Sequence, residues 1–131
     1  MPVELKILAL STIVLLFYVI AATQSKTAQY GAKWNMGARD AAVPEPSALT
    51  GRLIRAQANF LETYPIAIIA LLGVVVANKT SARTALGGWI WLGARVVYWP
   101  LYAAGVPLVR TIVWGIGIAG LVMVIWPLLA G

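Results

Sequence analysis

Long apolar segments alternate with short polar ones along this chain of 131 residues. Three segments carry no charged side chain: Ile7–Ala22, Thr63–Ala77 and Thr111–Leu129. A fourth, Thr84–Val109, contains a single charged residue, Arg95. A helix needs about 20 residues to cross the hydrocarbon of a bilayer. The pattern therefore predicts an all-α membrane protein, a bundle of four transmembrane helices.

We predict one four-helix membrane domain over residues 1–131. The expected spans cover residues 3–23, 50–77, 84–105 and 107–129, and residues 24–49 form the one sizeable loop. Pro44 and Pro46 argue against a continuous helix in that loop, because proline lacks the amide donor that a helix interior requires. The first span resembles a signal peptide, but Glu4 is unusual before such a segment, so we interpret it as a retained helix.

Composition supports the membrane assignment and excludes several kinds of chemistry. The chain is 61% hydrophobic, with a mean hydropathy of +0.86, and its 10 basic and 4 acidic residues are too few to cover a soluble globule of this size. It has no cysteine and no histidine, so disulfides, a protein thiolate and the usual zinc sites are excluded. Any thiol chemistry must come from a ligand. We expect no metal ion and no nucleic acid as partner.

The distribution of lysine and arginine predicts the orientation. With four spans, the long loop and the turn between the last two spans share one face, and both termini share the other. The first face carries more basic residues, and such loops stay in the cytoplasm. The chain's compact length, with no eukaryotic-style targeting signal, favours a bacterial source. We therefore expect an inner-membrane protein with a cytoplasmic long loop and periplasmic termini.

The second span places polar side chains inside the membrane. Its charge-free part, Thr63–Ala77, is too short to cross at about 1.5 Å per residue, so the helix must extend back through the sequence RAQANFLE. On a helix Arg55, Asn59 and Glu62 share one face with Arg52. Polar groups at this depth usually face a bundle interior or a cavity.

The third span presents a matching polar face at the same depth. Arg95, Tyr98 and Tyr102 fall at positions i, i+3 and i+7, and Arg110 begins the fourth span nearby. One interpretation is purely structural, with Glu62 pairing with an arginine and the tyrosines forming an interfacial belt. A single carboxylate cannot neutralise three arginines, however. The surplus predicts a small anionic ligand that also carries an amine, such as a peptide with two carboxylates.

Two motifs carry a resemblance to a known family. The stretch Arg55–Pro65, R-A-Q-x-N-x-x-E-x-x-P, resembles the second-helix signature of the MAPEG family, the membrane-associated proteins in eicosanoid and glutathione metabolism. The pattern R-x-x-Y-x-x-x-Y, starting at Arg95, resembles that family's third-helix signature. Chain length, four spans and a long first loop also match. The resemblance thus covers nearly the whole chain.

The resemblance implies a homotrimer that binds glutathione between adjacent subunits near the cytoplasmic side. Carried over position by position, it assigns glutathione contacts to Arg55, Asn59, Glu62, Tyr98 and Tyr102. Gln57 would reach in from the neighbouring subunit, and Arg95 would support the site. Arg110 resembles the arginine that stabilises the glutathione thiolate in catalytic members, and Thr111 stands where some members have a serine that holds the thiol.

The implied function is transfer of glutathione to lipophilic electrophiles that enter from the bilayer, or their reduction by it. A guanidinium in a low-dielectric site favours a thiolate, and the thiolate is the nucleophile. Arg110 is the first candidate for this role, and Arg95 is the alternative. A member that binds lipids or partners without catalysis is the second functional hypothesis. A small multidrug-type transporter is the third, disfavoured because the first span lacks a membrane-embedded acidic residue.

Overall fold

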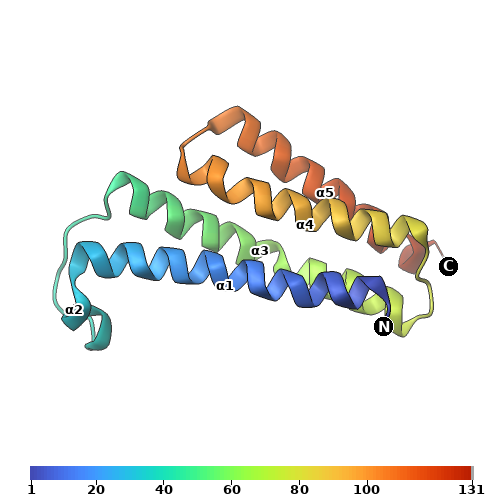
Figure 1. The fold of residues 1–131 in the computed structure, drawn as a ribbon, viewed down its shortest axis with the longest axis horizontal. Helices are drawn as coiled ribbons and strands as arrows, with labels where there is room; N and C mark the ends of the chain where they lie inside the picture. Colours follow the sequence, from blue (N-terminus) through green and yellow to red (C-terminus); the bar gives the residue numbers. More distant parts are fainter. Residues whose placement is uncertain (131) are drawn as a thin grey trace.

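The computed structural model describes residues 1–130, and five helices form its framework (Figure 1). Their bounds are α1 Val3–Tyr30, α2 Ala32–Met36, α3 Ala48–Val76, α4 Ala82–Ala103 and α5 Pro107–Leu129. Residues 1–130 contain no strand. The all-α bundle of four long helices that the apolar pattern predicts is confirmed.

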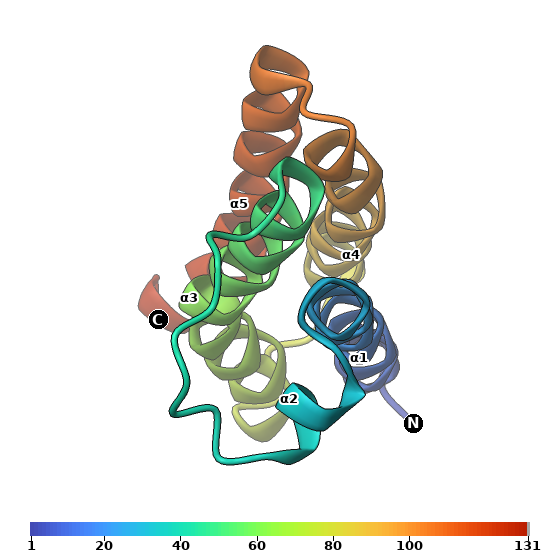
Figure 2. The same cartoon turned by 90° about the vertical axis from the view of Figure 1, so that its left-hand side faces the viewer.

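The four long helices pack as two pairs. The α1 helix packs chiefly against α3, and α4 forms a hairpin with α5 (Figure 1). Both termini and the α3–α4 turn lie at one end of the bundle, whereas α2 and the α4–α5 turn lie at the other. Figure 2 looks onto this second end, where the connection between α2 and α3 runs along the outside of the bundle. The α4–α5 hairpin diverges from α3 toward this end.

Local signals in the sequence set the helix boundaries. Ser47 begins α3 by accepting a hydrogen bond from the Thr50 amide, as an N-cap residue does. A reciprocal pair of side-chain bonds between Ser81 and Thr84 caps α4 in the same way. After α4 the chain turns at Gly105, whose φ of 74° is accessible to glycine at little cost.

The first helix is longer than its apolar segment. It continues through Gln24–Tyr30, which we predicted to be loop, and ends at Gly31, whose φ is 100°. The polar residues of this segment do not end the helix, because none of them is a glycine or proline. The predicted loop also holds the short helix α2. Only the stretch that contains Pro44 and Pro46 is irregular.

Three helices, α1, α3 and α5, are long and apolar enough to cross a membrane. The α4 helix falls outside this group, because its glycines, its aromatic residues and Arg95 lower its mean hydropathy. That α4 also spans the bilayer stays a prediction.

An aromatic cluster fills the centre of the bundle. Phe60 packs edge-on against Tyr18 and Tyr64, with ring centroids 4.9 and 5.2 Å apart, and Trp91 stacks on Tyr64 at 6.2 Å. One polar atom of this cluster, the Tyr18 hydroxyl, donates a hydrogen bond of 2.6 Å to the Arg95 carbonyl. This cluster lies directly behind the polar faces of α3 and α4 and supports them.

Candidate functional site

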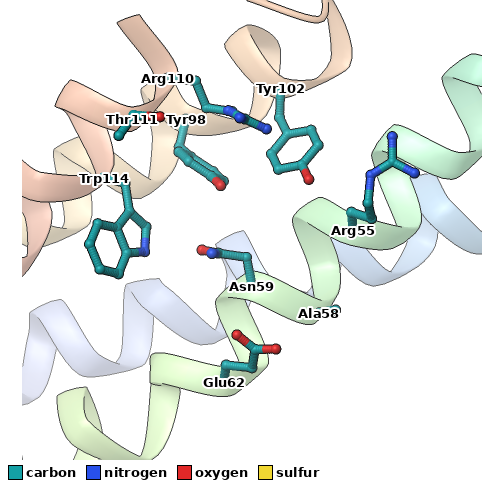
Figure 3. Close-up of a pocket in the computed structure, with 9 residues that line it drawn as sticks. All are labelled: Arg55, Ala58, Asn59, Glu62, Tyr98, Tyr102, Arg110, Thr111 and Trp114. Atoms are coloured by element: carbon teal, nitrogen blue, oxygen red, sulfur yellow. The ribbon is translucent and has the colours of Figure 1, made fainter. Parts of the chain in front are cut away.

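A cavity of about 430 Å³ lies between α3 and the α4–α5 hairpin (Figure 3). All three of these helices contribute to its wall. It is lined by Arg55, Ala58, Asn59 and Glu62 of α3, Tyr98 and Tyr102 of α4, and Arg110, Thr111 and Trp114 of α5. Seven of the nine predicted site residues therefore meet around one space, although residues 55 and 111 lie far apart in sequence.

The α3 wall follows from helical periodicity. Ala56 and Phe60 are fully buried in the core, which turns Arg55, Asn59 and Glu62 toward the cavity. Arg55 and Glu62 are exposed and Asn59 is half-buried. Arg55, Asn59 and Glu62 of this stretch thus line the cavity, while Ala56 and Phe60 anchor the helix in the core.

Two tyrosines form the α4 wall. Tyr98 is 4% exposed, Tyr102 is half-buried, and their rings meet edge to face with centroids 5.5 Å apart. Their hydroxyl groups point from α4 toward α3 (Figure 3). The pair therefore offers two phenolic hydroxyls, each able to donate or accept a hydrogen bond, to a ligand held on α3.

Arg110 is held at the mouth of the cavity by Tyr102. Its guanidinium carbon lies 4.5 Å from the centre of the Tyr102 ring, which is a cation–π contact (Figure 3). Thr111 also lines the cavity, but its hydroxyl donates to the Pro107 carbonyl at 3.1 Å within its own helix. The charge of Arg110 is therefore available to a ligand, whereas the hydroxyl hydrogen of Thr111 is already engaged.

Arg95 lies behind the cavity wall. It is only 4% exposed, and its guanidinium donates to Asn59 Oδ1 at 2.9 Å and to Thr63 Oγ1 at 2.7 Å. The rings of Phe60 and Tyr98 flank it, with their centres 4.9 and 5.2 Å from its guanidinium carbon. Arg95 therefore orients Asn59 and joins α4 to α3, but it is not part of the cavity lining.

Gln57 lies outside the cavity of its own chain. It is half-buried on α3 and is absent from the lining residues. The expectation that it reaches a neighbouring subunit's site stays a prediction.

Two lining residues, Ala58 and Trp114, were missing from the sequence-based set. Ala58 is three residues after Arg55 and four before Glu62, and Trp114 is four residues after Arg110. Helical spacing therefore places both on the cavity faces of their helices. These intervals were visible in the sequence and would have been sufficient to predict both lining residues.

The cavity carries an excess of positive charge. Arg55 and Arg110 line it together with one carboxylate, Glu62. Within residues 1–130, no hydrogen bond joins Glu62 to either Arg55 or Arg95; Arg95 is bound by neutral oxygens instead. The purely structural interpretation, an internal pair between Glu62 and an arginine, therefore does not describe this arrangement.

Residues 1–130 contain no group of three or more histidine, cysteine, aspartate or glutamate side chains placed to hold a metal ion.

Comparison with known proteins gives one match. The model of the MAPEG family matches residues 5–130, nearly the full chain. No curated protein and no solved structure matches significantly. Together with the three apolar helices, the family match identifies the chain as an integral membrane protein.

Proposed function

The chain belongs to the MAPEG family, and on that premise we propose that its cavity binds glutathione and transfers it to, or reduces with it, lipophilic electrophiles. The family is associated with glutathione and includes transferases and peroxidases as well as non-catalytic members. The observation that carries the proposal is the charge balance of the cavity, in which two arginines and one carboxylate make no hydrogen bond to one another within residues 1–130.

Glutathione complements this set of groups. It has two carboxylates, which suit arginine, and one ammonium group, which suits the Glu62 carboxylate. The Tyr98 and Tyr102 hydroxyls and the Asn59 amide can bond its peptide groups. The cavity volume of about 430 Å³ also lies within the range of about 300–1,000 Å³ typical of small-molecule sites.

Arg110 is the residue that we propose stabilises the thiolate. It lines the cavity, whereas Arg95 lies behind Asn59 and donates two hydrogen bonds, to Asn59 and to Thr63. A guanidinium beside the sulfur favours the thiolate, so the thiol proton is lost to water in the open cavity. In a transfer reaction the sulfur then attacks an electrophilic carbon, forming a carbon–sulfur bond as the leaving group departs with its electron pair.

We propose that the functional unit is a homotrimer with shared sites. In one chain, Arg55, Ala58 and Glu62 remain exposed, which leaves room for a second copy to complete the cavity. This arrangement would give Gln57 a ligand in the adjacent subunit. We further propose an inner-membrane location with the cavity on the cytoplasmic side, because the cavity lies at the end of the bundle that carries the long loop.

One observation favours the alternative of a non-catalytic binding protein. The Thr111 hydroxyl donates to its own helix, so this chain has one donor fewer for a thiolate. Arg110 does not share this limitation, because its contact with Tyr102 is through the ring face. We therefore retain the enzyme as the preferred function.

Calorimetric titration of the purified protein tests the binding proposal. We expect saturable binding of glutathione, and weaker binding of an N-acetylated glutathione that cannot offer an ammonium group to Glu62. No heat of binding with glutathione, in protein that is monodisperse and helical, would reject the proposal. Equal affinity for the two ligands would reject the role of Glu62.

A further inference from the structure

Arg52 bridges the end of the bundle at which the cavity opens. Its Nε donates a hydrogen bond of 2.9 Å to the Ala103 carbonyl, which joins the start of α3 to the last residue of α4. The same side chain covers Gly105, since a Cβ atom on that glycine would meet its Cδ, Nε and Cζ atoms at 3.6 to 3.8 Å. Arg52 is absent from the cavity lining.

The partner of Arg52 is a group that needs a donor. Carbonyls in the last turn of a helix have no partner within that helix, and a cation at this end also interacts favourably with the helix dipole. Gly105, with its φ of 74°, lets the chain reverse here, and its amide donates to the Tyr102 carbonyl at 3.0 Å. Arg52, which belongs to α3, therefore contacts the α4–α5 turn through the Ala103 carbonyl and Gly105.

Two arginines thus link α3 to α4 in the α4–α5 hairpin. Arg95 joins the helices behind the cavity through Asn59 and Thr63. Arg52 joins them at the turn, where the hairpin diverges from α3 (Figure 1). The cavity lies between these two links. Tyr102 directly precedes the bonded carbonyl, and Arg110 lies in the first turn of α5.

We propose that Arg52 is a positioning residue that holds the α4–α5 turn at the distance from α3 required by the site. Glutathione bound on α3 then meets Tyr102 and Arg110 on the hairpin at the same time. Without this link, α3 keeps its own ligand groups, but Arg110 moves away from the sulfur. This inference rests on the proposed function for its consequence, whereas the link itself is testable without any ligand.

The link is tested by a distance measurement. The natural chain has no cysteine, so Leu49→Cys and Leu108→Cys, both at exposed positions near the open end, give a unique pair for spin labels. Labelled protein is diluted with unlabelled protein to suppress distances between copies. We expect Arg52→Met to lengthen and broaden the distance distribution. Arg52→Lys, which keeps a cationic donor on a stem of similar reach, should restore it in large part.

A matched control separates this effect from a general loss of charge. Arg83 is exposed in the first turn of α4, at the opposite end of the bundle. Arg83→Met should leave the distance distribution unchanged. An unchanged distribution in Arg52→Met would overturn the proposal, whatever the protein does with glutathione.

The functional consequence is tested on the same variants. In Arg52→Met we expect the glutathione dissociation constant to change by less than about threefold. We expect kcat with a lipophilic electrophile to fall about tenfold, a factor that corresponds to the net free energy of about one hydrogen bond. The pKa of the bound thiol should rise toward that of free glutathione, a shift that a smaller folded fraction would not produce. Arg52→Lys should recover both quantities in part.

The outcomes separate the two proposals. Strong loss of glutathione binding in Arg52→Met with an unmoved thiol pKa would make Arg52 a ligand contact and overturn its positioning role. A wild-type protein that binds no glutathione would overturn the proposed function, while the distance measurement still decides whether Arg52 holds the turn.

Discussion

The two ends of the α4–α5 hairpin differ in how closely its helices approach their neighbours, and different kinds of residue line each end. At the end near the chain termini, Gly87 and Gly120 bring the helices into contact, and a Cβ on either one would come within 2.5 Å of the other's carbonyl oxygen. At the other end, tyrosine and arginine side chains line a cavity of about 430 Å³. Small residues therefore close one end of the bundle, and large polar residues keep the other open.

Two of the four carboxylate side chains, Glu4 and Glu62, show the same contrast. Glu4 is 3% exposed at the closed end and accepts a hydrogen bond of 2.5 Å from the Thr84 hydroxyl, which itself helps to cap α4. Glu62 is exposed at the open end, beside arginines that it does not bond within residues 1–130. A carboxylate with an internal partner stabilises the fold. Glu62 makes no such bond within residues 1–130, and we propose that it serves a ligand instead.

The largest expected effect comes from removing the ligand groups of the open end. Arg55→Ala and Glu62→Gln should each weaken glutathione binding by about 2–5 kcal/mol, the usual cost of truncating one member of a charge pair that is desolvated, here by the ligand and the adjacent subunit of the proposed trimer. Glu4→Gln is the matched control, because the amide oxygen can still accept from Thr84. Calorimetry on the three variants checks the contrast. Equal losses in Glu62→Gln and Glu4→Gln would abolish the distinction between the two carboxylates.

Arg110→Ala should separate catalysis from binding. We expect turnover of a lipophilic electrophile such as chlorodinitrobenzene to fall by about 100-fold, the order of one lost charge-stabilising group. Glutathione binding should remain largely intact, because Arg55, Asn59 and Glu62 stay in place. Arg110→Lys should recover only part of the rate, since a point charge replaces a planar fork. A larger loss in Arg95→Ala with wild-type rates in Arg110→Ala would transfer the role to Arg95.

The closed end is tested by adding one methyl group. Gly120→Ala would place a Cβ 2.5 Å from the Gly87 carbonyl oxygen and 2.9 Å from the Trp91 amide, so we expect a loss of about 1–3 kcal/mol in stability. Gly93→Ala is the control, because nothing lies within 4 Å of its added methyl group. Thermal unfolding in detergent compares them. An equal melting temperature in both variants would refute close packing as the reason for Gly120.

The smallest expected effect is that of Thr111→Val. The hydroxyl already donates to the Pro107 carbonyl, so its removal should change glutathione turnover by less than about threefold. Steady-state kinetics of this variant beside Thr111→Ser provide the check. A tenfold loss in Thr111→Val that Thr111→Ser avoids would show that the hydroxyl leaves its helix to bind the thiol.

Periodicity predicted the polar faces well, because helical spacing alone decides which residues share a side. The positions of Arg55, Asn59 and Glu62 follow from their intervals, and those of Tyr98 and Tyr102 do as well. Spacing carries no information on depth, however. Arg95 has the interval of a cavity residue, but its long side chain turns behind the wall to Asn59 and Thr63.

The sequence was less informative about helix ends and about contacts across the bundle. Hydropathy located the membrane part of α1, but not its polar extension to Tyr30, because polarity does not end a helix. Arg52 shares a face with Arg55 by spacing, yet its guanidinium bonds the Ala103 carbonyl. That contact depends on how α4 ends and turns, which the spacing within α3 cannot encode.

The most direct test of the account is the pKa of the glutathione thiol bound to the wild-type protein. Thiolate absorbance in the ultraviolet, followed against pH with glutathione at saturation, gives this value. We predict a pKa well below that of free glutathione, and a return toward the free value in Arg110→Ala. An unshifted pKa in the wild type, together with no turnover of any electrophile tested, would contradict the enzyme and leave a binding protein in its place.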